Sequence, residues 1–242
     1  MKITFLGTSH AIPQADRYCT CAMIEAGGVI YFIDAGAPLM EEIVKLGKDI
    51  HDVRAVFATH CHLDHINGIP SLAGPLNWFF KDASVSFYLP EQRVIDAYKT
   101  LLSYTVGRLD EERVRFYLTD KDFVYEDENI RLSLIPTAHM NPSYAILVEC
   151  EGKRVLFSGD LSGGLKKGDV PHVLFEKAID LFVCELAHLG MDDIKPYLER
   201  SLARSVCFNH VSPIEKLDEI KTAADSYPFP IRAVNDRDEI VL

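Results

Sequence analysis

The densest group of side chains suited to metal chemistry is the run Thr-His-Cys-His-Leu-Asp-His at residues 59–65. It directly follows an apolar segment with the composition of a strand. At a strand end, His60 and His62 face the same side, because residues two apart share a face. If the chain then turns into a helix, Asp64 and His65 swing toward a neighbouring point. This spacing predicts two adjacent metal positions, and the alternative is a solvated polar loop that holds its histidines by chance.

Three more candidate ligands, His139, Asp160 and His210, each follow a short apolar segment elsewhere in the chain. A metal site needs more ligands than one loop can supply, so residues of this kind are expected at distant strand ends. Taken singly, each is better explained as a core histidine or a turn aspartate. The repeated order of strand and then ligand, together with the first run, favours one site built from all of them.

The elements that must position these residues are strands that recur along the chain, with helices between some of them. The predicted strands are residues 2–6, 22–26, 29–34, 55–59, 85–89, 124–125, 130–137, 144–150, 154–158, 181–184, 205–209, 231–233 and 239–242. The predicted helices are residues 39–46, 63–72, 91–104, 171–178, 192–201 and 214–227, the last opened by Ser212-Pro213. Gly27-Gly28 and Glu151-Gly152 are typical of hairpin turns, so the sheets are expected to be partly antiparallel.

The composition is that of an ordinary globular protein, because 48% of the 242 residues are hydrophobic and 25% are charged. Disorder, collagen and coiled coil are thereby excluded. A chain of this length can bury a single core, and no linker, repeat or low-complexity segment divides it, so we expect one domain over residues 1–242. The formal net charge of −11 works against nonspecific attraction to nucleic acid or anionic lipid.

Membrane insertion and export are not expected. No apolar stretch approaches the roughly 18 residues that suggest a membrane span. Residues 1–6 have the pattern of a strand and not of a secretory signal. The six cysteines are scattered without a Cys-x-x-Cys pair, which is typical of buried thiols in a reducing compartment. We therefore predict a soluble, cytoplasmic protein.

The order and spacing of these motifs resemble the metallo-β-lactamase superfamily over nearly the whole chain. Within that superfamily the likeness is closest to ribonuclease Z, the tRNA 3′-processing endonuclease, and related phosphodiesterases. The residues that carry this likeness are Phe5-Leu-Gly-Thr8 with Pro13 and Arg17, Phe32-Ile-Asp-Ala-Gly36, residues 59–70, Pro142-Ser-Tyr144, Ser158-Gly-Asp160 and His210-Val-Ser-Pro213.

The resemblance implies an α+β fold, the αββα four-layer sandwich, with a dinuclear metal site in a cleft at one edge. By motif, one divalent ion takes His60, His62 and His139, the other takes Asp64, His65 and His210, and Asp160 bridges both. Imidazole and carboxylate suit zinc, iron or manganese, with zinc favoured, and the thiolate set of a closed structural zinc site is absent. We therefore expect an open, catalytic site.

Four further residues are candidates for supporting roles. Asp34, at the end of the predicted strand 29–34, is expected to orient a ligand histidine, and the alternative is a helix or turn cap before Ala35-Gly36. Glu185 and His188 look similar to an acidic residue and a histidine near the leaving group in ribonuclease Z relatives. Together with Asp64 they are candidate catalytic residues, with His188 as general acid or phosphate contact, and the alternative for His188 is a surface histidine. His10 is a weaker candidate for lining the same cleft.

The favoured function is metal-dependent hydrolysis of a phosphodiester, with a hydroxide that bridges the two ions as nucleophile. The same ions could polarise a carbonyl, so thioester or lactone hydrolysis is an alternative. A noncatalytic metal-binding protein is another. Because two divalent ions outweigh the ligand carboxylates, the expected partner is an anionic small molecule or nucleotide.

Recognition of tRNA is expected to be weak or absent. Leu63 stands where ribonuclease Z usually has Gly, no Gly- and Lys-rich arm is visible, and an Arg-Tyr pair is missing after Pro213. The basic groups are thinly spread, as Lys166-Lys167, Arg113 with Arg115, and Arg200 with Arg204.

The aromatic segment Leu76-Asn-Trp-Phe-Phe80 is open to two interpretations. Packing of the outer helices into the core is the first. The second is a substrate lid or a dimer surface, because exposed apolar patches usually mark contacts, and a homodimer is therefore kept as an alternative.

Overall fold

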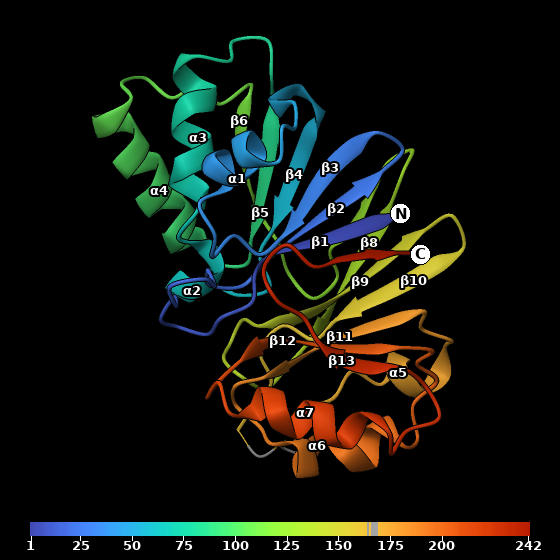
Figure 1. The fold of residues 1–242 in the computed structure, drawn as a ribbon. Coiled ribbons are helices and arrows are strands. Elements are labelled where there is room, and N and C mark those ends of the chain that lie inside the picture. The colour runs from blue at the N-terminus through green and yellow to red at the C-terminus, as the bar shows by residue number, and fades with distance from the viewer. Residues whose placement is uncertain (164, 166–168) are drawn as a thin grey trace.

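The protein, described by a computed structural model over residues 1–163, 165 and 169–242, contains two seven-stranded sheets packed face to face within those ranges (Figure 1). In spatial order, the first sheet consists of β14 (Glu239–Val241), β1 (Lys2–Gly7), β2 (Cys21–Ala26), β3 (Val29–Ile33), β4 (Val53–Phe57), β5 (Val85–Leu89) and β6 (Val114–Leu118). The second consists of β13 (Ile231–Ala233), β12 (Val206–Val211), β11 (Leu181–Leu186), β10 (Lys153–Phe157), β9 (Tyr144–Cys150), β8 (Arg131–Pro136) and β7 (Val124–Glu126).

Helices cover the outer face of each sheet, as Figure 1 shows. They are α1 (Leu39–Lys45), α2 (Leu63–Ile66), α3 (Ile69–Trp78), α4 (Gln92–Thr105), α5 (Val173–Glu176), α6 (Met191–Leu198) and α7 (Lys216–Ala224), with a 3₁₀ turn at Ile50–Asp52. The buried apolar side chains form three clusters. One lies between α1, α3, α4 and the first sheet, one between the sheets, and one between the second sheet and α5 to α7. The expected αββα sandwich is confirmed.

Strand direction determines where loops gather. In the first sheet β1 is antiparallel to β2 and β2 to β3, whereas β3 and β4 are parallel, so β1, β3 and β4 all end at the same edge. In the second sheet β8, β10, β11 and β12 likewise run in one direction. Because the carboxyl ends of co-directional strands share an edge, the segments that follow these seven strands meet at one side of the sandwich.

The structure differs from the sequence prediction in one missed strand and two helices. β6 is a missed strand: it lies at the sheet edge and pairs with β5 alone, so its outer residues Tyr117 and Leu118 are exposed and the strand lacks a clear alternation. The predicted helix 63–72 is two helices, α2 and α3. At the break, the backbone N–H of Gly68 donates to the carbonyl of Ala35, and a Cβ on Gly68 would lie 1.8 Å from the oxygen of Ala37.

Helix α7 begins at Lys216, and not at the expected Ser212-Pro213 pair. Pro213 accepts a hydrogen bond from the backbone N–H of Lys216, so a turn precedes the helix.

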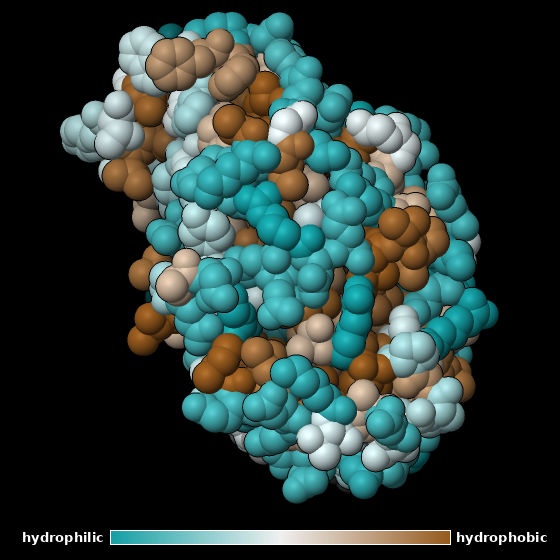
Figure 2. All heavy atoms as spheres, viewed as in Figure 1, coloured by the Kyte–Doolittle hydropathy of each residue, from teal (hydrophilic) through white to brown (hydrophobic). Residues whose placement is uncertain are grey.

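The aromatic segment at residues 76–80 divides between core and surface. Leu76 is buried in α3, whereas Trp78 is 55% and Phe79 is 79% exposed. Figure 2 shows hydrophobic residues in several patches among hydrophilic ones, one of them at the upper left, where Figure 1 places α3 and α4. The homodimer stays a prediction. Among the described residues, no helix is long and apolar enough to cross a membrane.

Gly159 holds the loop that carries Asp160. Its φ of +57° lies in the left-handed region, and a Cβ there would lie 2.5 Å from the carbonyl oxygen of Tyr144. Only glycine adopts this conformation at this spacing without strain.

We expect Gly159→Ala to lower the free energy of unfolding by about 2–5 kcal/mol, because a left-handed Ala costs about 1–2 kcal/mol and overpacking adds about 1–3 kcal/mol. Urea denaturation measures this. The control is Gly152→Ala. Gly152 has a φ of +77° but open space around the added Cβ, so this substitution should cost only the about 1–2 kcal/mol of a left-handed Ala. Equal losses in both variants would contradict the packing argument.

Candidate metal centre

The seven expected metal ligands come from four segments at the edge where the co-directional strands end. His60, His62, Asp64 and His65 follow β4, and the last two lie in α2. His139 follows β8 and Asp160 follows β10. The fourth segment is the end of β12, which contains His210.

A bulge in β12 turns His210 toward this edge. Glu185 of β11 pairs with Asn209 and Leu186 pairs with Val211, so His210 is the extra residue of the register. Its φ is +52°, a strained value for a non-glycine residue. Bulges that re-aim a side chain are common next to functional sites.

The first ligand group, His60, His62 and His139, is compact. Nε2 of His60 lies 3.0 Å from Nδ1 of His62, and that Nδ1 lies 3.2 Å from Nε2 of His139. The second ligand group, Asp64, His65 and His210, is looser. Oδ2 of Asp64 lies 3.8 Å from Nε2 of His65 and 3.8 Å from Nε2 of His210.

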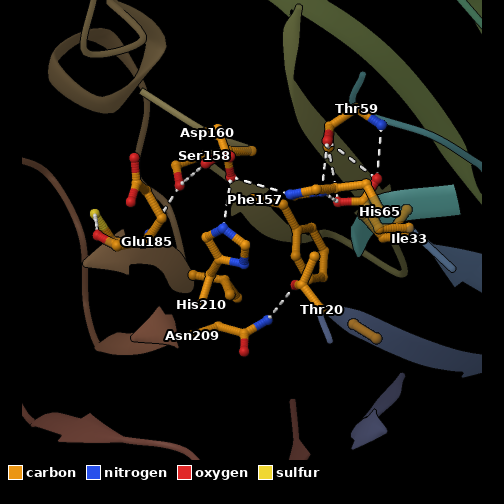
Figure 3. Close-up of a pocket in the computed structure, with 15 residues that line it drawn as sticks. Thr20, Ile33, Thr59, His65, Phe157, Ser158, Asp160, Glu185, Asn209 and His210 are labelled. Carbon is orange, nitrogen blue, oxygen red and sulfur yellow. Dashed lines mark hydrogen bonds and ion pairs between the residues drawn. The ribbon is translucent and has the colours of Figure 1, made fainter. Parts of the chain in front are cut away.

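Asp160 stands between the two groups and turns a different oxygen to each. Its Oδ1 lies 3.3 Å from Nε2 of His65 and 3.4 Å from Nε2 of His210. Its Oδ2 lies 3.6 Å from Nε2 of His60 and 3.6 Å from Nε2 of His139. Figure 3 shows both His65 and His210 pointing a ring nitrogen at Asp160. This is the geometry expected of a bridging carboxylate.

The residues present fit divalent cations. Nε2 of His65 and Oδ1 of Asp160 are fully buried, yet neither makes a hydrogen bond, although they lie 3.3 Å apart. Buried polar atoms without partners are costly, and a cation between them would satisfy both. Two donors about 2.0–2.1 Å from one zinc ion lie about 2.9–3.4 Å apart at angles between octahedral and tetrahedral. The spacings within the first ligand group fall in that range.

The protonation states also suit metal binding, which needs ionised carboxylates and neutral imidazoles. Burial holds the pKa of His60 well below its usual range and lowers the pKa of His139. Burial alone would raise the pKa of Asp160, but His210 and His65 outweigh it and hold that pKa well below its usual range.

His65 is the exception. Burial disfavours its charge, but the carboxylates of Asp160 and Asp34 raise its pKa. Its Nδ1 faces Asp34, so a second proton would be on Nε2, facing Asp160. A cation at that position would compete with the proton.

Asp34 orients His65. Its Oδ2 accepts a hydrogen bond from Nδ1 of His65 at 2.8 Å, and its Oδ1 accepts from the backbone N–H and the hydroxyl of Thr59 at 2.8 and 3.0 Å. The contact fixes the tautomer in which the lone pair of Nε2 faces Asp160. Asp34 has a φ of +58°, which lets the end of β3 turn its carboxylate into the site.

Glu185 and His188 lie beside the first ligand group. Glu185 is buried and accepts hydrogen bonds from the backbone N–H groups of Leu161, Ala187 and His188 at 2.7–2.9 Å. Its Oε1 also lies 3.1 Å from Nδ1 of His188, and this hydrogen bond raises the pKa of His188. The ring of His188 is 4.6 Å from that of His139, centroid to centroid.

Sequence reasoning missed Asp169. This buried carboxylate accepts hydrogen bonds from the backbone N–H of Ala138, at 2.6 Å, and of Ser162. It therefore ties the loop before His139 to the loop after Asp160. The sequence around Asp169 carries no signal for this role, because the contact joins segments distant along the chain.

The remaining histidines divide between the site and the surface. His10 lies at the site, with Nδ1 2.9 Å from Nε2 of His210. His51 pairs with Asp49 and Asp82 on the surface, and His172 is exposed.

Two cavities adjoin the ligands. The inner one, shown in Figure 3, is lined by Asp34, His65, Asp160 and His210 among others and measures about 30 Å³, which is too small for an organic substrate. The outer one measures about 480 Å³ and touches Asp64. Ligand pockets usually have about 300–1,000 Å³, so the outer cavity is the one that can accept a substrate.

Comparison with known proteins supports the same architecture. The chain matches the family described as Anti-Pycsar protein Apyc1 over residues 1–194. It is 27% identical to ribonuclease Z of Methanocaldococcus jannaschii over 149 residues, which cover 61% of this chain and 47% of that protein. The chain thus spans about half the length of this curated relative.

Two solved structures share the fold. The metallo-β-lactamase fold protein YhfI from Bacillus subtilis has a TM-score of 0.81 at 15% identity, with 99% of this chain and 98% of that chain covered. The short form of human tRNase Z has a TM-score of 0.76 at 17% identity, with 100% and 99% covered. The expected likeness to the metallo-β-lactamase superfamily and to ribonuclease Z is confirmed.

We expect Asp34→Asn to weaken zinc affinity about 10–100-fold, because a neutral amide makes His65 a less basic ligand and no longer fixes its tautomer. Competition with a chromophoric chelator measures this. The control is Asp49→Asn, which alters a similar Asp–His contact of 2.6 Å at the exposed His51 and should leave the affinity unchanged. An unaltered affinity in Asp34→Asn would contradict the orienting role.

Proposed function

We propose that this chain, which belongs to the Anti-Pycsar protein Apyc1 family, is a metal-dependent hydrolase that acts on a small, nucleotide-type phosphodiester. Two divalent cations, with zinc favoured, would be held by the two ligand groups and bridged by Asp160. The observation that carries the proposal is the division of the Asp160 carboxylate, with one oxygen near each imidazole cluster. The similarity of this chain to ribonuclease Z over part of its length favours phosphate ester chemistry.

When bound, such a cation pair supplies a water of lowered pKa, near 7, as nucleophile and neutralises charge that develops on the phosphate. The protein's own part is to hold the donors in place. Asp34 fixes His65, and Asp169 ties the loops of His139 and Asp160 together. Asp64 accepts a hydrogen bond from the backbone N–H of Ala11 at 2.9 Å, which orients its carboxylate.

His188 is the best candidate for a group that contacts the substrate. It is partly exposed, unlike Glu185 behind it, and the hydrogen bond between them favours a protonated ring. A protonated imidazole at this position would donate to a phosphate oxygen or to the leaving oxygen of the ester.

The outer cavity favours a substrate of nucleotide size. Its walls combine apolar groups of Ala11, Pro13 and Leu63 with polar groups of Asn67 and Ser71, and it begins beside Asp64. A phosphodiester bound at the ligands could therefore extend one flat, partly polar substituent into this space.

The basic residues of the chain do not favour a long RNA. Arg113 is mostly buried and donates to the carbonyl groups of Leu76 and Phe80 and to Asp110, and Nη1 of Arg204 pairs with Asp180, so both guanidiniums already have partners within the protein. Lys166 and Lys167 lie outside the described residues. We therefore propose weak or no tRNA binding.

The main prediction is that the metal-loaded protein hydrolyses bis(p-nitrophenyl) phosphate and thymidine 5′-p-nitrophenyl phosphate, and is less active on a lactone, a glutathione thioester or a tRNA precursor. Chelation should abolish turnover and added zinc should restore it. His62→Ala and Asp64→Ala should each lower kcat/KM at least about 100-fold, since each removes a donor. The exposed His172→Ala serves as control and should retain full activity.

Activity confined to the lactone or the thioester would replace the phosphodiesterase proposal with the carbonyl alternative. Equal turnover in the wild type, His62→Ala and Asp64→Ala would leave only a noncatalytic metal-binding protein.

A separate prediction concerns the outer cavity. Leu63 is 73% exposed and lines this cavity, whereas Ile12, at 77% exposure, is not among its lining residues. We expect Leu63→Ala to raise KM for thymidine 5′-p-nitrophenyl phosphate about 3–10-fold, since partial burial of a leucine by a ligand contributes about 1 kcal/mol. KM for methyl p-nitrophenyl phosphate, which cannot fill the cavity, should change less than about twofold. Ile12→Ala should change neither KM value. If Leu63→Ala raised KM equally for both substrates, the outer cavity would not be the binding site for the nucleoside part of the substrate.

A further inference from the structure

His10 lies in the segment that follows β1. The backbone N–H of Ser9 donates to the carbonyl of Tyr18 at 2.8 Å, which closes the loop. The buried guanidinium of Arg17 donates to the hydroxyl of Thr8 at 2.9 Å. These contacts hold the segment just before His10, and its ring lies against His210.

The contact between His10 and His210 has the geometry of the contacts within the first ligand group. The ring nitrogens of His10 and His210 are 2.9 Å apart and the rings cross at 85°. For His60 and His62 the corresponding values are 3.0 Å and 77°. For His62 and His139 they are 3.2 Å and 87°. The motif assigns those two pairs to one ion, and the third pair repeats their arrangement.

An ordinary hydrogen bond between the two rings conflicts with metal binding by His210. A neutral ring nitrogen has one lone pair in its plane. If Nδ1 of His10 donated its proton to Nε2 of His210, that lone pair would be used and His210 could not bind a cation through Nε2. Two nitrogens about 2.9 Å apart are compatible when both direct their lone pairs at one ion.

Asp64 completes the local set. Its Oδ2 lies 3.8 Å from Nδ1 of His10 and 3.8 Å from Nε2 of His210. One donor atom from each of the three residues lies within 4.8 Å of the others. His10 is thus placed like a ligand of the second group, and not like a histidine on the cleft wall.

We propose that His10 is an additional metal ligand, an eighth donor side chain that binds beside Asp64 and His210. This inference rests on the proposed metal centre. With His10, the second group offers three imidazoles, as the first group does, in addition to its own Asp64. Ala11, the next residue, lines the outer cavity with Asp64, so His10 is also adjacent in the chain to the space proposed for the substrate.

The test uses zinc alone, without substrate, on the full chain. Zinc affinity is measured by chelator competition, and the number of imidazoles per zinc is measured by X-ray absorption. We expect His10→Ala to lower the affinity for one of the two ions at least about tenfold and to lower the mean imidazole count. The exposed His51→Ala and His172→Ala should leave both values unchanged.

His10→Gln provides a second variant of similar shape. It keeps a hydrogen-bond donor for His210 but lacks a strong zinc donor, so it should behave like His10→Ala if His10 binds metal. Unchanged affinity and imidazole count in either folded variant would overturn the inference and leave the proposed function standing. Wild-type protein that binds no zinc at all would overturn the proposed function as well, so the two failures are distinguishable.

Discussion

The buried carboxylate of Asp160 is the constraint on which the rest of the site depends. It is almost completely excluded from solvent, and a carboxylate in that position is costly unless positive charge or hydrogen-bond donors surround it. The imidazoles of His60, His65, His139 and His210 surround it, but none of them makes a standard hydrogen bond to its Oδ1. The arrangement is explained if the carboxylate and the imidazoles share cations.

Both sheets must contribute to this arrangement, because no single loop can surround a carboxylate. The strand directions bring the loops to one edge, and hydrogen bonds between the sheets hold them in register. The backbone N–H of Tyr144 donates to the carbonyl of Thr59 at 3.0 Å, and the side chain of Asn209 donates to the hydroxyl of Thr20 at 3.1 Å. Each bond joins a segment of the second sheet to one of the first. The ligand groups are therefore kept at a fixed spacing by contacts that are not themselves ligands.

Much of the site could be predicted from the sequence, since ligand residues follow strands at positions that a local pattern reveals. The run at residues 59–65 and the isolated His139, Asp160 and His210 were found in this way. Asp169 could not be, because its two hydrogen bonds join loops that are distant in sequence. The break between α2 and α3 was missed for the same reason: the close approach of Gly68 to Ala35 and Ala37 is a tertiary contact. Local periodicity predicts helices and strands, whereas the contacts that set their ends and their orientation depend on the assembled fold.

The charge of the chain links its composition to the size of its substrate. With a formal net charge of −11, and with Asp34, Asp64, Asp160 and Glu185 at the site, the protein without cations would repel a phosphodiester. Two divalent cations would outweigh the two ligand carboxylates, Asp64 and Asp160, and so attract an anion locally, but salt screens their field within about 10 Å. A nucleotide in the outer cavity would lie within that distance of the cations. A long RNA would extend beyond it, over an acidic surface, so its added phosphates would meet repulsion. The same electrostatics that require the metal therefore favour a small substrate.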